Sequence, residues 1–217
     1  MLAQKEKMKD KERDESAAEI SKLLKLLYLR TQGPENAASC LHLQGETSRE
    51  LWFDFGPPKK LSRADFRKHF SHLRFDKALQ YVAFPQIELE GNGEPPDVAD
   101  LLEDMTFFFE WLGQRGVSRI IKVIVDDFKA PSHSDEAIER ALTPFDVEIL
   151  DWRRLDLDPI SLSKIGTHLR EVYLQWSGRN SVLRSWSEKE GLALIPTLEV
   201  IHLIQHEVHI CPYISGV

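Results

Sequence analysis

Leu169-Arg-Glu-Val-Tyr-Leu174 and Leu198-Glu-Val-Ile-His-Leu203 are two short segments with the same spacing of apolar residues, and they decide the predicted fold. In both, apolar residues stand at the first, fourth and sixth positions, and the composition favours a β-strand. Two more strands are predicted upstream, at 117–125 and 147–152. Because stretches long enough for a helix separate the four segments, we expect parallel strands joined by helical crossovers.

The shared pattern Leu-x-x-(Val/Ile)-x-Leu is the strand signature of leucine-rich repeats, which usually present a binding surface. The match is imperfect, because the asparagine usual at the turn is missing and Trp152-x-x-Leu155-x-Leu157 also fits the pattern. An ordinary parallel α/β sheet is the alternative. We predict an α/β fold in which an N-terminal helical and small-strand part precedes a leucine-rich-repeat-like parallel β/α region.

The sequence divides into three parts. Residues 1–16 mix charges of both signs with few apolar side chains, and they predict a disordered tail or a frayed helix start. Residues 17–90 form an N-terminal α+β region, and residues 97–210 form the leucine-rich-repeat-like β/α region. The Gly- and Pro-rich stretch 91–96 between them is the predicted linker. Short strands are predicted in the N-terminal region at 40–43, 51–55 and 81–84.

An amphipathic helix is predicted at 17–30, because its apolar residues fall at helical spacing. This apolar face comprises Ile20, Leu23, Leu24, Leu27 and Tyr28. We expect the face to pack on the core of this chain. The alternative is that it docks a partner or a neighbouring domain.

Other helix starts carry recognisable caps. Ser62 with Asp65 forms a capping box, and the helix that it opens is predicted to reach Leu73. Ser134 and the Asp158-Pro159 pair mark two later starts. A further helix is predicted at 97–113, and we expect its aromatic residues to pack in the core.

Composition excludes several classes of protein. The net charge is −7 and the pI is about 5.6, which argues against a general nucleic-acid binder because such proteins need a basic surface. Only two cysteines are present, as expected in a reducing compartment. The start lacks the apolar stretch of a signal peptide, and no run is long enough to span a membrane. We expect an intracellular, cytoplasmic protein.

Carboxylates and histidines supply the candidates for a metal site. Asp126 and Asp127 end a predicted parallel strand, and Asp151 lies in the next strand. We predict no metal site, because aspartate commonly closes a strand and begins a turn. The alternative is that the three carboxylates hold Mg²⁺. A second group, His202, His206, His209 and Cys211, has zinc-ligand chemistry but the wrong spacing for an extended strand. We predict no catalytic residue and no cofactor.

Tryptophan and arginine gather in the C-terminal third of the chain, and both types are favoured at interaction hot spots. They predict a protein-interaction surface. Its members are Trp152, Arg153, Arg154, Arg170, Trp176, Arg179, Arg184 and Trp186. The alternative for the tryptophans is a role in core and turn packing.

Several idiosyncratic segments within about residues 40–204 carry a likeness to a known group of proteins. They are Ser71–Phe75, Trp111–Val117, Ile121–Asp127, Ser132–Ile138, Asp151–Arg153, Leu155–Leu157, Leu169–Val172, Gln175–Gly178 and Asn180–Glu188. Together they resemble the non-catalytic region before the subtilisin-like (S8) peptidase domain in large multidomain proteins of filamentous fungi.

The resemblance implies an intracellular fungal protein in which this region positions, regulates or recruits partners to a serine peptidase. It does not transfer catalysis, because Asp127 is followed by Phe128 rather than glycine, and His133 by Ser134. We therefore expect a non-catalytic protein–protein interaction or regulatory module, with a peptidase domain as the candidate partner. One alternative is a truncated part of a serine endopeptidase that lacks its catalytic domain, and a third is a metal-dependent hydrolase.

Overall fold

One parallel sheet organises the part of the chain that the structure, a computed structural model, describes. That part comprises residues 2–41, 49–56, 62–85, 87, 104–128 and 132–205, with side chains from residue 11 onward. The elements in chain order are α1 (Leu2–Thr31), α2 (Pro34–Leu41), β1 (Trp52–Asp54), α3 (Arg63–His69), β2 (Ala78–Phe84), α5 (Asp104–Gln114), β3 (Arg119–Asp126), α6 (Asp135–Leu142), β4 (Asp146–Arg153), α7 (Pro159–Lys164), β5 (Glu171–Trp176), α8 (Asn180–Ser187), the 3₁₀ turn η1 (Leu192–Leu194) and β6 (Val200–Gln205).

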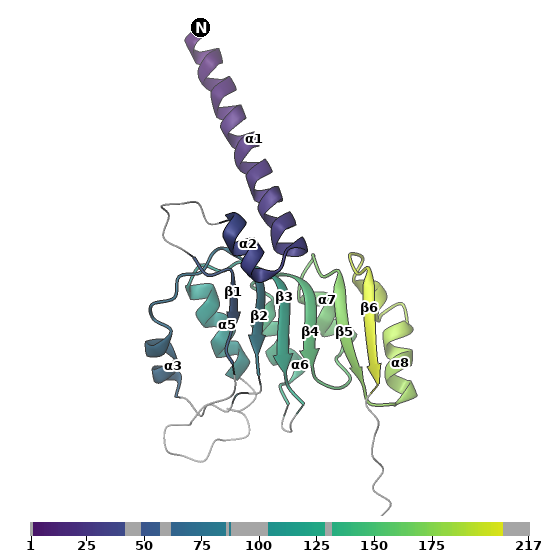
Figure 1. Cartoon of the computed structure of the whole chain (residues 1–217). Coiled ribbons are helices and arrows are strands. Elements are labelled where there is room, and N and C mark those ends of the chain that lie inside the picture. Colours follow the sequence, from purple (N-terminus) through teal and green to yellow (C-terminus); the bar gives the residue numbers. More distant parts are fainter. Residues whose placement is uncertain are drawn as a thin grey trace, which may run out of the picture.

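In the described residues, six strands pair in parallel in the order β1-β2-β3-β4-β5-β6, which is also their order in the chain (Figure 1). The prediction of an α/β fold with parallel strands is confirmed at this level. The leucine-rich-repeat-like character stays a prediction. The sheet also crosses the predicted linker, because β2 pairs with β3 over most of its length. The N-terminal and C-terminal regions therefore share one sheet and one core.

The crossover helices cover one face of the sheet, which we call the helix face. Side chains from α3, α5, α6, α7 and α8 join strand residues in one buried cluster. Aromatic rings from α3 and α5 dominate its first half; Phe66 and Phe108, for example, lie edge to face with centroids 4.8 Å apart. The predicted core role of the α5 aromatics is confirmed, because Phe107, Phe108 and Phe109 are all buried.

Four central strands bury apolar residues at the same three positions, i, i+3 and i+5. These are Leu79, Val82 and Phe84; Ile120, Val123 and Val125; Val147, Leu150 and Trp152; Leu169, Val172 and Leu174. Side chains in a strand alternate between faces, so the odd step from i to i+3 means that the alternation breaks near the start of each strand. The residues at i+1 and i+2 consequently both turn away from the helix face.

The opposite face is covered at the N-terminal ends of the strands by α1 and α2 (Figure 1). Leu26 and Leu29 of α1 and Ala37 of α2 pack there against Leu51 and Ile121. Residues at the i+1 positions, which point away from the helix face, make polar contacts with the end of α1. Gln80 donates to the carbonyl oxygens of Leu29 (3.0 Å) and Gln32 (2.6 Å).

Arg30 anchors the end of α1 to the sheet. Its Nε and Nη2 atoms donate to the two carboxylate oxygens of Glu148, each at 2.8 Å. Glu148 is almost completely buried. The hydrogen bond to Glu148 raises the pKa of Arg30 above its usual value, against the opposing effect of partial burial.

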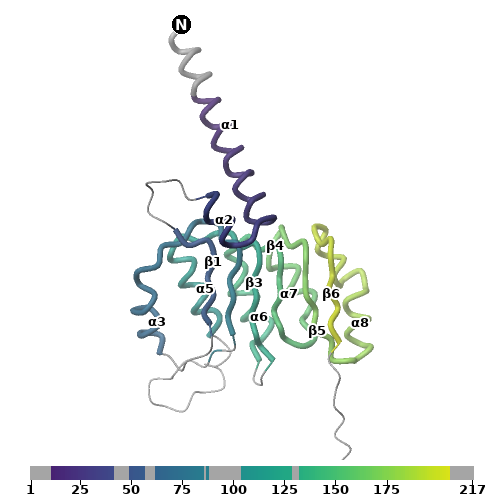
Figure 2. The backbone as a smooth tube through the Cα atoms, in the orientation of Figure 1, coloured from purple at the N-terminus to yellow at the C-terminus, as the bar shows by residue number. Residues whose placement is uncertain are grey.

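The predicted packing of the apolar face of α1 is wrong. Leu26 and Leu29 contact the sheet, whereas Ile20, Leu23, Leu24, Leu27 and Tyr28 remain 38–60% exposed. The helix leaves the body of the molecule at a steep angle, as Figure 2 shows, so only its last turns reach the sheet. Residues 2–16, predicted as a disordered tail or a frayed helix start, belong to this continuous helix.

Of the local predictions, the helix caps are correct and some element boundaries are wrong. The caps are confirmed, because Ser62, Ser134 and Asp158 accept hydrogen bonds from backbone N–H groups three residues later. The strand predicted at 40–43 is wrong for residues 40 and 41, which end α2, while 42 and 43 lie outside the described residues. The helix predicted to reach Leu73 ends at His69. The linker at 91–96 lies outside the described residues.

Among the helices that the structure describes, none has both the length and the apolar character of a membrane span.

Replacing Arg30 by alanine tests the anchor of α1. The change leaves Glu148 buried with fewer partners, so we expect the free energy of unfolding to fall by about 1–3 kcal/mol. The measurement is urea denaturation followed by circular dichroism. Lys22→Ala on the exposed side of the same helix is the control, and an equal loss in both variants would show that Arg30 carries no special contact.

Candidate functional site

The face opposite the crossover helices is only partly covered by the elements that the structure describes. We call the uncovered side of β3, β4, β5 and β6 the open face. Since core side chains of β3, β4 and β5 point to the helix face, the residues that alternate with them point to the open face. They are Lys122, Ile124, Asp126, Ile149, Asp151, Arg153, Glu171, Tyr173 and Gln175. Most of them are half-buried.

Arg153 joins two carboxylates on this face. Its Nη1 atom donates to Asp126 at 2.8 Å, and its Nε and Nη2 atoms donate to Asp151 at 3.3 and 3.2 Å. Partial burial disfavours the charge of the guanidinium, but the hydrogen bonds and attraction of Asp151 and Asp126 outweigh it, so the pKa of Arg153 lies above its usual value. The pair of strands β3 and β4 thus ends in a charged cluster in which one guanidinium binds two carboxylates.

A second group on the open face is aromatic. The Tyr173 ring stacks on His202 with centroids 4.1 Å apart, and Lys122 Nζ lies 5.0 Å from the Tyr173 centroid. His202 Nε2 lies 2.9 Å from Glu171 Oε1. Burial raises the pKa of the Tyr173 hydroxyl, and the nearby Glu171 and Asp151 carboxylates raise it further. The hydrogen bond with Glu171 engages the hydroxyl and favours its protonated form.

The same face carries aromatic rings at its other end. Trp52 of β1 and Tyr81 of β2 are paired in the sheet register, and their rings stack with centroids 6.5 Å apart. Tyrosine, tryptophan and arginine on a rigid sheet are residue types enriched at protein interfaces. The open face offers Tyr173 and Arg153, whereas Trp52 packs against the cluster that α1 and α2 cover.

The three candidate metal ligands do not converge. Asp126 and Asp151 share Arg153, whose positive charge occupies the place between them. Asp127 points to the helix face, where it is buried. Among the described residues, no group of three or more His, Cys, Asp or Glu side chains is arranged to hold a metal ion. Of the second candidate group, only His202 lies within the described residues, and it binds Glu171.

Asp127 and His133 form a buried pair that resembles part of a hydrolase triad. Asp127 accepts hydrogen bonds from the His133 backbone N–H, from His133 Nδ1 at 3.0 Å and from Trp152 Nε1 at 2.9 Å. His133 Nε2 accepts the backbone N–H of Met105 at 3.3 Å. This geometry assigns Nδ1 as the donor and Nε2 as the acceptor. Because Nε2 is occupied by the start of α5, this pair fastens the helix and the loop after β3 together.

The predicted tryptophan and arginine surface does not form one patch. Trp152 and Trp186 cannot contribute to a surface, because both are buried in the core, where Trp186 Nε1 donates to the Leu157 carbonyl at 2.8 Å. Trp176 is half-buried, and its Nε1 donates to the carbonyl of Arg179. Both tryptophan burial and this turn contact match the packing alternative.

The arginines of the predicted surface are separated as well. Arg154 is held by both oxygens of Asp135 on the helix side, each at 2.9 Å. Arg170 lies near Glu148 and Glu199 at the start of β5, at the opposite end of the strands from Arg153. Arg179 and Arg184 are exposed near α8. Only Arg153 belongs to the open face.

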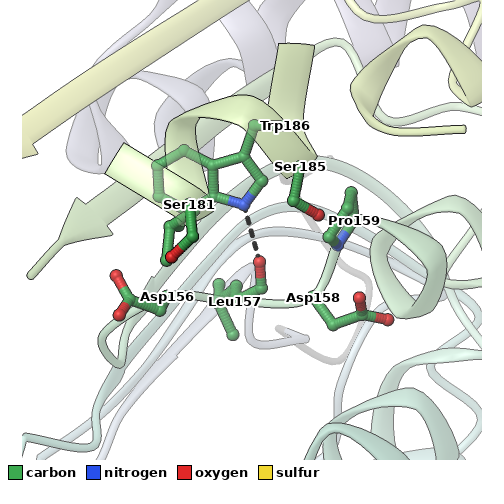
Figure 3. A pocket seen from close by; sticks show the side chains of 8 residues that line it. Asp156, Leu157, Asp158, Pro159, Ser181, Ser185 and Trp186 are labelled. Carbon is green, nitrogen blue, oxygen red and sulfur yellow. Dashed lines mark hydrogen bonds between the residues drawn. The ribbon is translucent and has the colours of Figure 1, made fainter. Parts of the chain in front are cut away.

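A small pocket of about 190 Å³ lies between the start of α7 and α8 (Figure 3). Its polar lining is largely engaged in local structure. Asp158 caps α7 through the Ser161 N–H, and Asp156 accepts from the backbone and hydroxyl of Ser177. Asp156 itself has a positive φ of 57°, which these two hydrogen bonds hold in place. The pocket is therefore a product of turn architecture, with little free chemistry for a ligand.

Comparisons with known proteins add no assignment. No family model, no curated protein and no solved structure matches the chain.

Sequence patterns missed the open face, although a signal for it exists. Tyr173 stands between Val172 and Leu174, which point to the core, and such alternation marks a side chain of the opposite face. The apolar positions alone locate the strands, whereas the residues between them locate the surface.

Replacing His133 by alanine tests the structural role of the buried pair. The change removes the acceptor for the Met105 N–H and one donor to Asp127, so we expect a loss of about 2–3 kcal/mol in the free energy of unfolding. His72→Ala, at an exposed position, is the matched control and should leave stability nearly unchanged. The measurement is chemical denaturation, and a His133 variant as stable as the control would contradict the assignment.

Proposed function

We propose that this chain is a non-catalytic module for protein–protein interaction, and that the open face of the sheet is its binding surface. The observation that carries the proposal is the cluster of Tyr173, Lys122 and Arg153, which lies half-exposed on three adjacent strands. Arg153 is held by Asp126 and Asp151, and Tyr173 is held by its stack on His202, so a partner meets a preorganised surface. Such preorganisation lowers the entropic cost of binding.

The repeated core positions support a leucine-rich-repeat-like architecture as the finer form of this proposal. Four strands bury residues at i, i+3 and i+5, the spacing of the repeat signature. Strand order follows chain order, as it does when repeats stack side by side. In such scaffolds the strand face that the helices leave uncovered is a natural surface for a partner.

The resemblance to regions before fungal subtilisin-like peptidase domains suggests what the partner is. We propose that the module serves a peptidase-related protein of that kind and binds a subtilisin-like peptidase domain in order to position or regulate it. This step rests on the sequence likeness, and the open face supplies the surface for it.

Two other functions are weaker. The chain as part of a serine endopeptidase requires a catalytic domain, and the buried Asp127–His133 pair offers none because His133 Nε2 is bound to the backbone of Met105. A metal-dependent hydrolase requires carboxylates that converge, whereas Asp126 and Asp151 bind Arg153. The interaction module accounts for more of the observed contacts than either.

A binding experiment tests the main proposal. The probe is a purified subtilisin-like peptidase domain from a filamentous-fungal multidomain protein, titrated against this chain by biolayer interferometry. We expect Tyr173→Ala to weaken binding at least about tenfold, since aromatic anchors dominate interface energies. Tyr28→Ala on α1 is the matched control and should bind like the unmodified chain. Absence of binding, or loss only in the Tyr28 variant, would contradict the proposal.

The peptidase alternative predicts proteolytic activity, and the metal-dependent hydrolase alternative predicts stabilisation by a metal ion. We expect neither. The purified chain should neither hydrolyse a generic protein substrate nor react with a serine-directed fluorophosphonate. Its melting temperature should stay the same when Mg²⁺, Mn²⁺ or Zn²⁺ is added, because binding to the native state would raise it. Labelling would favour the peptidase alternative, and a metal-dependent rise would favour the hydrolase.

A further inference from the structure

The edge strand β6 exposes side chains at positions that are buried in every central strand. Ile201 and Leu203 pair in register with Val172 and Leu174 of β5, so they point to the helix face. Val172 and Leu174 are fully buried, whereas Ile201 and Leu203 are 49% and 50% exposed. On the opposite face, Val200 and Ile204 are also exposed. The strand is thus apolar on both faces with no described element beyond it.

This edge lacks the protection that edge strands usually carry. Natural sheets protect their edges with short strands, charged side chains or proline. The other edge of this sheet follows that rule, because β1 has only three residues and ends at Asp54. Residues 200–205, Val-Ile-His-Leu-Ile-Gln, contain no charged residue and no proline. A six-residue edge with four exposed apolar side chains is a template for pairing with another strand.

The backbone of β6 shows which groups are available. The Val200 N–H donates to the Arg170 carbonyl at 3.0 Å, towards β5. Backbone groups alternate in direction along a strand, so those of Ile201, Leu203 and Gln205 point outward from the sheet. These outward groups are the ones that an added strand would bind.

We propose that β6 pairs with β6 of a second copy of this chain, antiparallel, about a two-fold axis that passes beside His202. In this register Ile201 lies opposite Leu203 of the second copy on the helix face, and Val200 lies opposite Ile204 on the other face. Each exposed apolar side chain meets an apolar partner. The outward N–H and C=O groups of Ile201 and Leu203 form the hydrogen-bonded pairs.

The self-complementary sequence selects the second copy over another occupant. An axis beside Leu203 would instead place Ile201 opposite Gln205, and would leave Leu203 facing its own copy. Two-fold symmetry makes the same patch serve both sides of the interface, which is the commonest arrangement in homo-oligomers. A pairing of a single strand edge is a small interface, so the dimer is expected to form reversibly in the micromolar range.

Sedimentation velocity over the concentration range that the protein's solubility permits tests the proposal with the full chain. The unmodified chain should shift from monomer to dimer, and Leu203→Lys should remain monomeric because a charge is buried against an apolar strand. Leu194→Lys, at a similarly exposed position in η1, is the matched control and should dimerise normally. Circular dichroism confirms that each variant folds.

A disulfide experiment tests the register. In a chain with Cys40 and Cys211 replaced by serine, His202→Cys places the new thiol opposite its own copy in a non-hydrogen-bonded pair. The Cα separation of such a pair, about 4.5 Å, lies within disulfide range. Mild oxidation should therefore yield a covalent dimer. The Ile204→Cys control faces Val200 and should not cross-link.

Three results would overturn the proposal. A monomer at all concentrations would show that β6 does not pair with a second copy. A dimer that survives Leu203→Lys but is lost in Leu24→Lys would place the interface on the exposed side of α1. A dimer without the His202→Cys cross-link would exclude this register. None of these outcomes depends on whether the open face binds a peptidase domain.

Discussion

The direction in which the chain crosses the sheet is the constraint on which the rest of this structure depends. Parallel strands joined by right-handed crossovers, and laid down in chain order without reversal, place their connecting helices on one face. The described helices between strands obey this rule and share one core. The opposite face must then be covered by something outside the β/α units or remain open, and α1 and α2 cover only the strand starts.

The break in alternation near each strand start connects this constraint to the way α1 is attached. It turns Glu148 away from the helix face, into a position where Arg30, Arg119 and Arg170 approach its carboxylate. A buried carboxylate is costly unless it is paired and hydrogen-bonded. The charged contacts from α1, β3 and the start of β5 therefore meet at one residue of β4. Because the anchor lies at the last turn of α1, the earlier turns extend beyond the body with their apolar side chains exposed.

Strand positions were predictable from the sequence, and the assignment of side chains to surfaces was not. The spacing around Leu169 and Leu198 located β5 and β6, since apolar strand residues recur at fixed intervals whether or not they are buried. The same kind of periodicity could not tell that Ile20 and Leu24 would be exposed, because an amphipathic helix has one apolar stripe whether or not a partner covers it. Trp152 and Trp186 were misplaced for a related reason, because composition records that tryptophan favours interfaces but not that these rings fill the core.

Strand geometry does, however, disfavour a metal ion shared by Asp126 and Asp127, because neighbouring residues of an extended chain point to opposite faces. His133 lies beyond such reasoning, because its role depends on the start of α5, which lies 28 residues earlier in the chain.

Pairing at the β6 edge would determine how the open faces of two copies lie relative to each other. An edge that pairs about a two-fold axis perpendicular to the sheet keeps the helix face of both copies on one side and the open face of both on the other. Two open faces would then form one continuous surface, with the Tyr173 and His202 stacks of both copies close to the axis. A partner with two binding sites would gain affinity from such an arrangement without any new contact. Self-association at β6 and recognition at the open face are thus compatible, because the first uses the strand edge and the second uses the side chains of the inner strands.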